Sequence, residues 1–167
     1  MISAIHVANS LLLKAKKENI SITPKKLYCL VYLLYSNVLY KYGIKLFNEP
    51  FSITNIGPIV PSLYFKFNCY GNKKIRSFAS NALGETFYVN NNDFNKCLEE
   101  IWLEYKNYSD VEINEIIKTN CAYSKYRIKN SDVLKDSDIL SSEINKNEEI
   151  LKRAKILKNN FIGFNGR

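Results

Sequence analysis

The chain has 167 residues, of which 46% are hydrophobic and 13% aromatic, and its formal net charge is +8. A chain of this length and apolar content can bury a core without a stabilising disulfide or metal, which excludes an intrinsically disordered protein. Its strongest apolar run, residues 27–35, is much shorter than the roughly 20 residues of a membrane-spanning helix, and no signal peptide is recognised, so we expect a cytoplasmic protein.

Two helices are predicted in the N-terminal quarter of the chain. Apolar residues recur at helical spacing over residues 2–17. Thr23 and Pro24 favour the start of a second helix, because a hydroxyl caps the first turn and proline fits it without losing a hydrogen bond. This second helix should end at Gly43. Apolar side chains surround most of its circumference, which is typical of a central, buried helix.

A less regular stretch separates these helices from a third one. Residues 44–56 are interrupted by proline and are expected to be extended or looped. Gly57 and Pro58 predict a turn. Residues 59–70 are predicted to form the third helix, which should end at Gly71.

A small sheet is also predicted. Residues 86–89 are β-branched or aromatic, which favours a short strand. We therefore expect a small hairpin or sheet contributed by residues 44–56 and 72–90.

The C-terminal half is predicted to be helical, with one irregular interruption. A cluster of asparagines caps a helix over residues 90–105, and residues 109–112 form a capping box that starts another. Residues 121–138 are polar and are expected to be irregular, and residues 142–160 carry the apolar spacing of a last helix.

These elements indicate one mainly α-helical domain over residues 1–167, with about five to six helices and a small β-hairpin or short sheet. No internal repeat, low-complexity tract or long linker divides the sequence.

Residues suited to catalysis or metal binding are sparse. His6 is the single histidine, and the six glycines form no phosphate-binding loop. The four cysteines lie too far apart for a zinc or redox pair and are expected to be free, buried thiols: Cys29, Cys69, Cys97 and Cys121. We therefore expect no enzymatic activity, no metal site and no cofactor.

The positive charge lies in the first half of the chain. Residues 1–77 hold 11 Lys and Arg against 2 acidic residues, a net charge of +9, whereas residues 78–167 hold 13 against 14, a net charge of −1. Such a basic half can meet nucleic acid or an acidic protein surface, or it can be a solvated face without a partner.

One series of motifs is more specific than composition. It comprises Thr23-Pro24-Lys25-Lys26-Leu27, Leu30-Val31-Tyr32, Tyr42-Gly43, Leu46-Phe47 with Glu49, and Gly57-Pro58-Ile59-Val60-Pro61-Ser62-Leu63-Tyr64 followed by Tyr70-Gly71. In this order the motifs resemble the Panacea domain family, which includes phage-associated antitoxin proteins of the GepA and SocA types. The resemblance covers residues 5–75.

The resemblance implies an antitoxin-like protein that neutralises a cognate toxin, encoded nearby, by direct protein–protein binding. It also implies a second mode of action, in which the protein is a proteolytic adaptor that delivers the toxin to a AAA+ protease. The basic first half leaves one alternative, a DNA-binding transcriptional autoregulator, for which binding would fall steeply with salt.

Two sets of residues in the motif segment are predicted to matter. Tyrosine joins an apolar ring to a polar tip, which suits interfaces. Partner binding is predicted for Tyr28, Tyr32, Tyr35 and Tyr64, with Lys25 and Lys26 as a polar rim. A role in the core is an equal alternative for Tyr32 and Tyr64, and Tyr64 should point back toward the second helix. A purely architectural role is predicted for Thr23, Pro24, Leu27, Gly57, Pro58 and Pro61.

Overall fold

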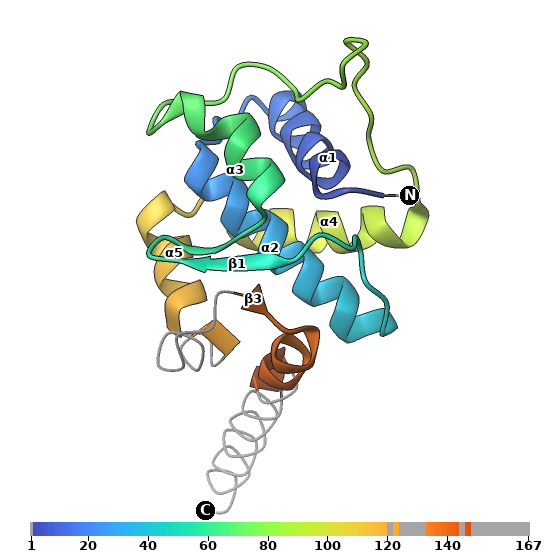
Figure 1. The fold of residues 1–167 in the computed structure, drawn as a ribbon, viewed down its shortest axis with the longest axis vertical. Coiled ribbons are helices and arrows are strands. Elements are labelled where there is room, and N and C mark those ends of the chain that lie inside the picture. The colour runs from blue at the N-terminus through green and yellow to red at the C-terminus, as the bar shows by residue number, and fades with distance from the viewer. Residues whose placement is uncertain (1, 120–121, 124–132, 144–145, 148–167) are drawn as a thin grey trace, which may run out of the picture.

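The fold is mainly α-helical, with one small antiparallel sheet, as the sequence predicts (Figure 1). The computed structural model describes residues 2–119, 122–123, 133–143 and 146–147. The helices are α1 (Ala4–Lys17), α2 (Pro24–Tyr42), α3 (Pro61–Phe67), which continues into the 3-10 turn η1 (Asn68–Tyr70), α4 (Asn92–Tyr105) and α5 (Asp110–Thr119). Residues 136–143 are also helical.

Helix α2 is the centre of the fold, as its apolar circumference predicts. It contacts α1, α3, α4, α5 and β2 (Gly57–Ile59), and in Figure 1 it runs diagonally through the middle of the molecule. The Thr23 hydroxyl caps its start by accepting the Lys26 N–H at 3.2 Å. Gly43 ends it in the left-handed conformation, with a φ of +66°, which glycine adopts without steric cost.

The sheet has the strand order β2-β1-β3, with β1 at Phe51–Thr54 and β3 at Val133–Leu134. Both neighbours of β1 are antiparallel to it, and Ser52 lies opposite Ile59 on one side and Val133 on the other. Two predictions are therefore corrected. The Gly57-Pro58 pair starts a strand, because the turn lies at residues 55–56. The third strand comes from residues 121–138, which were expected to be irregular.

The strand predicted at residues 86–89 is wrong, since residues 72–90 contain no strand. Side chains of α1 bind the backbone of this segment. The Ser10 hydroxyl accepts the Val89 N–H at 2.9 Å, and the Asn9 amide donates to the Phe87 carbonyl at 3.1 Å. Because these bonds satisfy backbone groups that a strand ladder would otherwise use, the segment packs against a helix without pairing in a sheet.

Helix starts in the C-terminal half follow their local signals. The Asn91 side chain accepts the N–H groups of the first turn of α4. Ser109 and Glu112 form the predicted capping box, with the Ser109 N–H donating to the Glu112 carboxylate at 2.7 Å. The last helix begins at residue 136 rather than 142, and most of its predicted length lies outside the described residues.

The free cysteines only partly match the prediction. Cys29 and Cys97 are buried, and Cys69 is exposed. Cys69 lies in η1, at a helix end that faces solvent, so its apolar sequence neighbours did not predict burial. Cys121 lies outside the described residues.

Candidate interaction surface

The two halves of the chain neutralise part of each other's charge. Lys14 pairs with Glu99 at 2.6 Å, Lys45 pairs with Asp136 at 2.6 Å, and Lys41 pairs with Glu100. In the reverse direction, Glu18 pairs with Lys106 at 2.9 Å. Three of the eleven basic residues in the first half are therefore paired with acidic residues of the second half that the structure describes.

Three of the four tyrosines predicted to bind a partner are core residues. Tyr28, Tyr32 and Tyr35 are 5%, 0% and 2% exposed. The Tyr32 ring packs edge-on against Phe51 at 5.4 Å between centroids. The Tyr35 hydroxyl donates to Asp136 at 2.8 Å and thereby ties α2 to the start of the last helix. Burial raises the pKa of all three phenols. These side chains offer a partner no surface in this fold.

The two rim lysines differ from each other. Lys26 is 5% exposed, and its ammonium donates to the carbonyls of Lys106 and Tyr108, each at 2.6 Å. Burial lowers the pKa of Lys26, and the nearby charge of Asp110 partly opposes that shift. Lys26 therefore fastens the start of α2 to the loop between α4 and α5, whereas Lys25 remains half-buried at the edge.

The residues predicted to be architectural lie at junctions between elements. The Thr23 hydroxyl donates to Asp110 at 2.5 Å, which joins the starts of α2 and α5. Leu27 is fully buried. Gly57 has a φ of +118°, a conformation that residues with a side chain rarely adopt. Pro58 is buried in β2, and Pro61 occupies the first turn of α3, where it loses no hydrogen bond.

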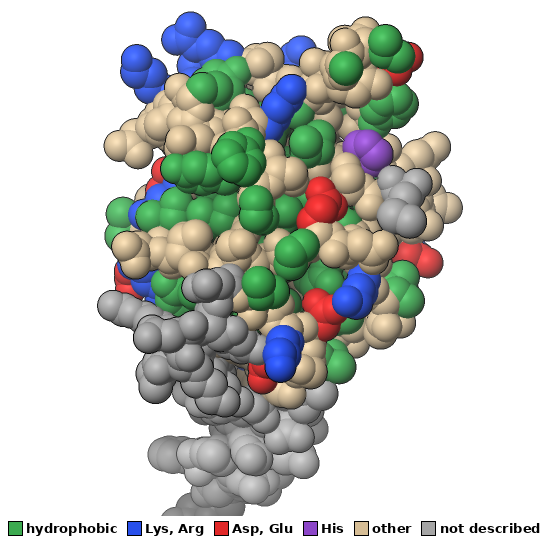
Figure 2. All heavy atoms as spheres, viewed as in Figure 1, with side chains coloured by type: hydrophobic (Ala, Val, Ile, Leu, Met, Phe, Trp, Pro, Cys, Tyr) green, Lys and Arg blue, Asp and Glu red, His purple; other side chains and the backbone are tan. Residues whose placement is uncertain are grey.

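Helix α3 presents aromatic rings to solvent. Leu63 and Phe67, four residues apart, are each 1% exposed and face the core, whereas Tyr64 is 40% and Phe65 84% exposed. We call the outer side of α3 and η1 the aromatic face. It consists of Pro61, Tyr64, Phe65 and Cys69, all exposed. Figure 2 shows hydrophobic side chains gathered over α3 and the neighbouring β1–β2 hairpin.

The rings of the aromatic face are held in place by their neighbours. The Tyr64 and Phe65 rings meet edge-on at 6.3 Å between centroids. Tyr64 also points back toward α2, as predicted, and lies 6.5 Å from the buried Tyr28 ring. Such packing lowers the conformational entropy that Tyr64 would lose on binding a partner.

Phe65 was missed by the sequence analysis. A signal existed, because Pro61 fixes the start of the helix, and the Leu63–Phe67 spacing of four residues places position 65 between two core positions. Because the exposed Phe65 ring adjoins the exposed Tyr64 ring, we name Phe65 as a candidate contact residue.

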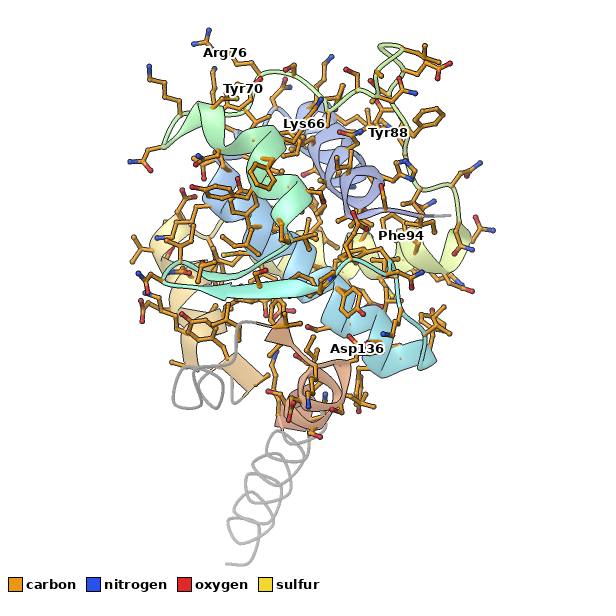
Figure 3. The ribbon with its side chains drawn as sticks, in the orientation of Figure 1. Lys66, Tyr70, Arg76, Tyr88, Phe94 and Asp136 are labelled. Atoms are coloured by element: carbon orange, nitrogen blue, oxygen red, sulfur yellow. The ribbon has the colours of Figure 1, made fainter. Side chains whose placement is uncertain are left out.

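A cluster of cations borders the aromatic face. Figure 3 shows Lys66, Tyr70 and Arg76 at the same end of the molecule. Lys66 donates to the Ser80 carbonyl at 3.0 Å, which places it beside the 77–80 segment. Lys73, Lys74 and Arg76 are exposed and form no ion pair with the described residues.

Other functional features are few in the part of the chain that the structure describes. His6 accepts the Ser3 N–H and packs on the Phe87 ring, so its role is to close the start of α1. No group of three or more His, Cys, Asp or Glu residues suited to a metal ion occurs among the described residues. No described helix has the length and apolar character needed to cross a membrane.

Comparisons of this chain with protein-family models, curated proteins and solved structures found no match.

Proposed function

We propose that this protein is an antitoxin-like interaction protein that neutralises a toxin encoded beside it by binding it directly. The observation that carries the proposal is the aromatic face, above all Phe65, whose ring is 84% exposed. The resemblance of residues 5–75 to the Panacea domain family suggests the class of partner.

An exposed aromatic surface supports a binding function, because leaving such an apolar surface in water is unfavourable. Aromatic side chains supply large apolar area for few rotatable bonds, and they are enriched among the residues that dominate binding energy. Tyr64 is already packed and Phe65 stands beside it, so a partner would bury both rings with little further ordering. Lys66 lies next to them and provides the charged rim, a role that the sequence predicted for Lys25 and Lys26.

The nucleic-acid alternative has weaker support. The basic half of the chain was its main argument, and Lys14, Lys41 and Lys45 from that half are engaged with acidic residues of the other half. Base recognition also favours arginine, asparagine and glutamine over the lysines that predominate here.

The test is co-expression with the product of the neighbouring open reading frame, followed by co-purification. Truncating a central aromatic anchor costs about 2 kcal/mol or more, which is roughly a thirtyfold loss of affinity. We therefore expect Phe65→Ala combined with Tyr64→Ser to abolish rescue of growth while the protein stays folded.

The matched control is Leu83→Ala, because Leu83 is 83% exposed and lies in a loop outside the aromatic face. Rescue should survive this change. Equal rescue by the Phe65/Tyr64 variant and the wild type would remove the aromatic face from the proposal. Failure of the wild-type protein to bind any neighbour-encoded product would overturn the function itself.

The mode of neutralisation is decided by a second measurement. If the protein masks its toxin, the half-life of the toxin in cells should be unchanged or longer when both are present. If the protein is an adaptor, the half-life should shorten, and deletion of the AAA+ protease should restore it.

A further inference from the structure

A groove of about 720 Å³ lies at the end of α1, and no residue of the aromatic face lines it. Its walls are the last turns of α1, the connection at residues 19–22 and the extended segment at residues 74–78. The Ile75 N–H donates to the Ile22 carbonyl at 2.8 Å and holds the two walls together. The groove is therefore a formed feature of the fold rather than a gap between loose loops.

The lining of the groove combines an apolar floor with a cationic rim. The floor contains Leu12, Ala15, Ile20, Ile22 and Ile75. The rim carries three exposed cations, Lys16, Lys74 and Arg76, and none of the described residues that line the groove is acidic.

These cations are available to an external anion. None of the three forms an ion pair with a described residue. The Lys16 ammonium lies 5.5 Å from the centre of the Phe78 ring, a contact that positions its charge without neutralising it. Arg76 can engage a carboxylate with two parallel hydrogen bonds.

We propose that this groove binds an acidic, amphipathic segment of a partner protein. Apolar side chains of that segment enter the aliphatic floor, and its carboxylates meet Lys16, Lys74 and Arg76. Charge complementarity selects the occupant, because the charged residues among those that line the groove are all cations. The inference does not depend on the toxin-binding proposal, whose residues Tyr64, Phe65 and Lys66 do not line the groove.

The lining favours a peptide over a nucleic acid. Single-stranded nucleic acid is held by aromatic platforms on which the bases stack. Among the lining residues only Phe78 is aromatic, and its ring is already engaged by Lys16 and by the edge-on Tyr88 ring at 5.6 Å. An aliphatic floor instead suits Leu, Ile or Phe side chains.

The experiment is selection of short random peptides displayed on phage against the full-length protein. Selected peptides should be enriched in Asp and Glu interleaved with large apolar residues. Their affinity should fall roughly tenfold or more for the triple variant Lys16→Glu, Lys74→Glu and Arg76→Glu. The matched control changes the same total charge outside the groove lining through Lys17→Glu, Lys73→Glu and Lys96→Glu. It should lose clearly less affinity than the groove variant, because none of its three residues lines the groove.

Peptides with exchanged charges distinguish a loss of charge recognition from a structural effect of the substitutions. Peptides in which Lys replaces each acidic residue should bind the triple Glu variant and not the wild type. Selected peptides without acidic enrichment, or peptides equally sensitive to the control changes, would overturn the proposal. So would tight binding of oligodeoxythymidine at about 150 mM salt that is lost in the triple variant, since the groove would then serve nucleic acid.

Discussion

The amide of Asn9 binds the backbone of Ala79 with both of its polar atoms. Its oxygen accepts the Ala79 N–H and its nitrogen donates to the Ala79 carbonyl, each at 2.9 Å, and the two residues are 0% and 2% exposed. A helix side chain thus takes the place of a neighbouring strand for a segment 70 residues away. This pair holds the long connection between η1 and α4 on the surface of α1.

Replacing Asn9 should therefore destabilise the whole domain. Asn9→Ala leaves two buried backbone groups of Ala79 without partners, and we expect the free energy of unfolding to fall by about 3 kcal/mol. Urea denaturation measures this change. The control is Asn95→Ala on the exposed side of α4, which should alter stability by no more than about 0.5 kcal/mol. Equal effects of the two substitutions would contradict a structural role for the Asn9–Ala79 pair.

Gly57 should tolerate no side chain, because of its backbone conformation. A Cβ at this position would meet the side chains of Asn114 and Ile117 at ordinary distances of 3.6 and 3.9 Å, so the strain comes from the φ of +118°. We expect Gly57→Ala to cost about 1–3 kcal/mol and Gly57→Val to cost more. Asn55→Ala in the adjoining turn is the control. An unchanged melting temperature for Gly57→Ala would show that the hairpin accepts another conformation.

Lys26 should contribute to stability through its two carbonyl partners. Lys26→Met keeps most of the buried stem and removes both hydrogen bonds, so we expect a loss of about 2 kcal/mol in the free energy of unfolding. The neighbouring Lys25→Met removes the same charge from a half-buried site and should have little effect. Similar losses for both variants would assign the effect to charge rather than to the bonds with Lys106 and Tyr108.

The loss of folding stability at acidic pH should depend on Glu18. Its hydrogen bond with Lys106 is the main reason that its pKa falls from 4.5 to about 2. Because the folded-state pKa is the lower one, the stabilisation is fully present above pH 4.5 and is lost as the pH falls through about 2. Glu18→Gln should make the urea midpoint less dependent on pH over that range. A wild-type slope in the Glu18 variant would contradict this assignment.

Cys69 gives a chemical test of the aromatic face. In a Cys121→Ser background, Cys69 should react quickly with a thiol reagent, because it is exposed, whereas Cys29 and Cys97 are buried. Burial also raises the pKa of the Cys29 thiol to about 12, so little reactive thiolate is present. Attachment of a bulky maleimide at Cys69 should block binding of the proposed toxin, and a Cys69→Ser variant should bind it normally after the same treatment. Binding that persists after full labelling would place the contact elsewhere.

Local signals were sufficient for most of the helices. The Thr23 cap, the left-handed Gly43 and the Ser109–Glu112 capping box each act within one helical turn. Residues so close in sequence meet whatever the rest of the chain does, so their pattern could be read directly.

The sheet and the candidate surfaces depended on contacts between distant residues. Phe51 pairs with Leu134, a residue far away in the sequence, so no local pattern could identify β3 as a partner of β1. The 72–90 segment is bound by side chains of α1, so no local pattern could exclude the strand predicted at residues 86–89. Likewise, the sequence identified tyrosines suited to an interface. In the structure, however, Tyr28, Tyr32 and Tyr35 are buried in the core around α2, whereas Phe65 is exposed. The reason is that a helix covered on most sides buries the apolar residues of its central turns, whereas Tyr40 and Tyr42 at the C-terminal end of α2 remain exposed. Which aromatic rings remain exposed is decided by how the outer helices pack against it.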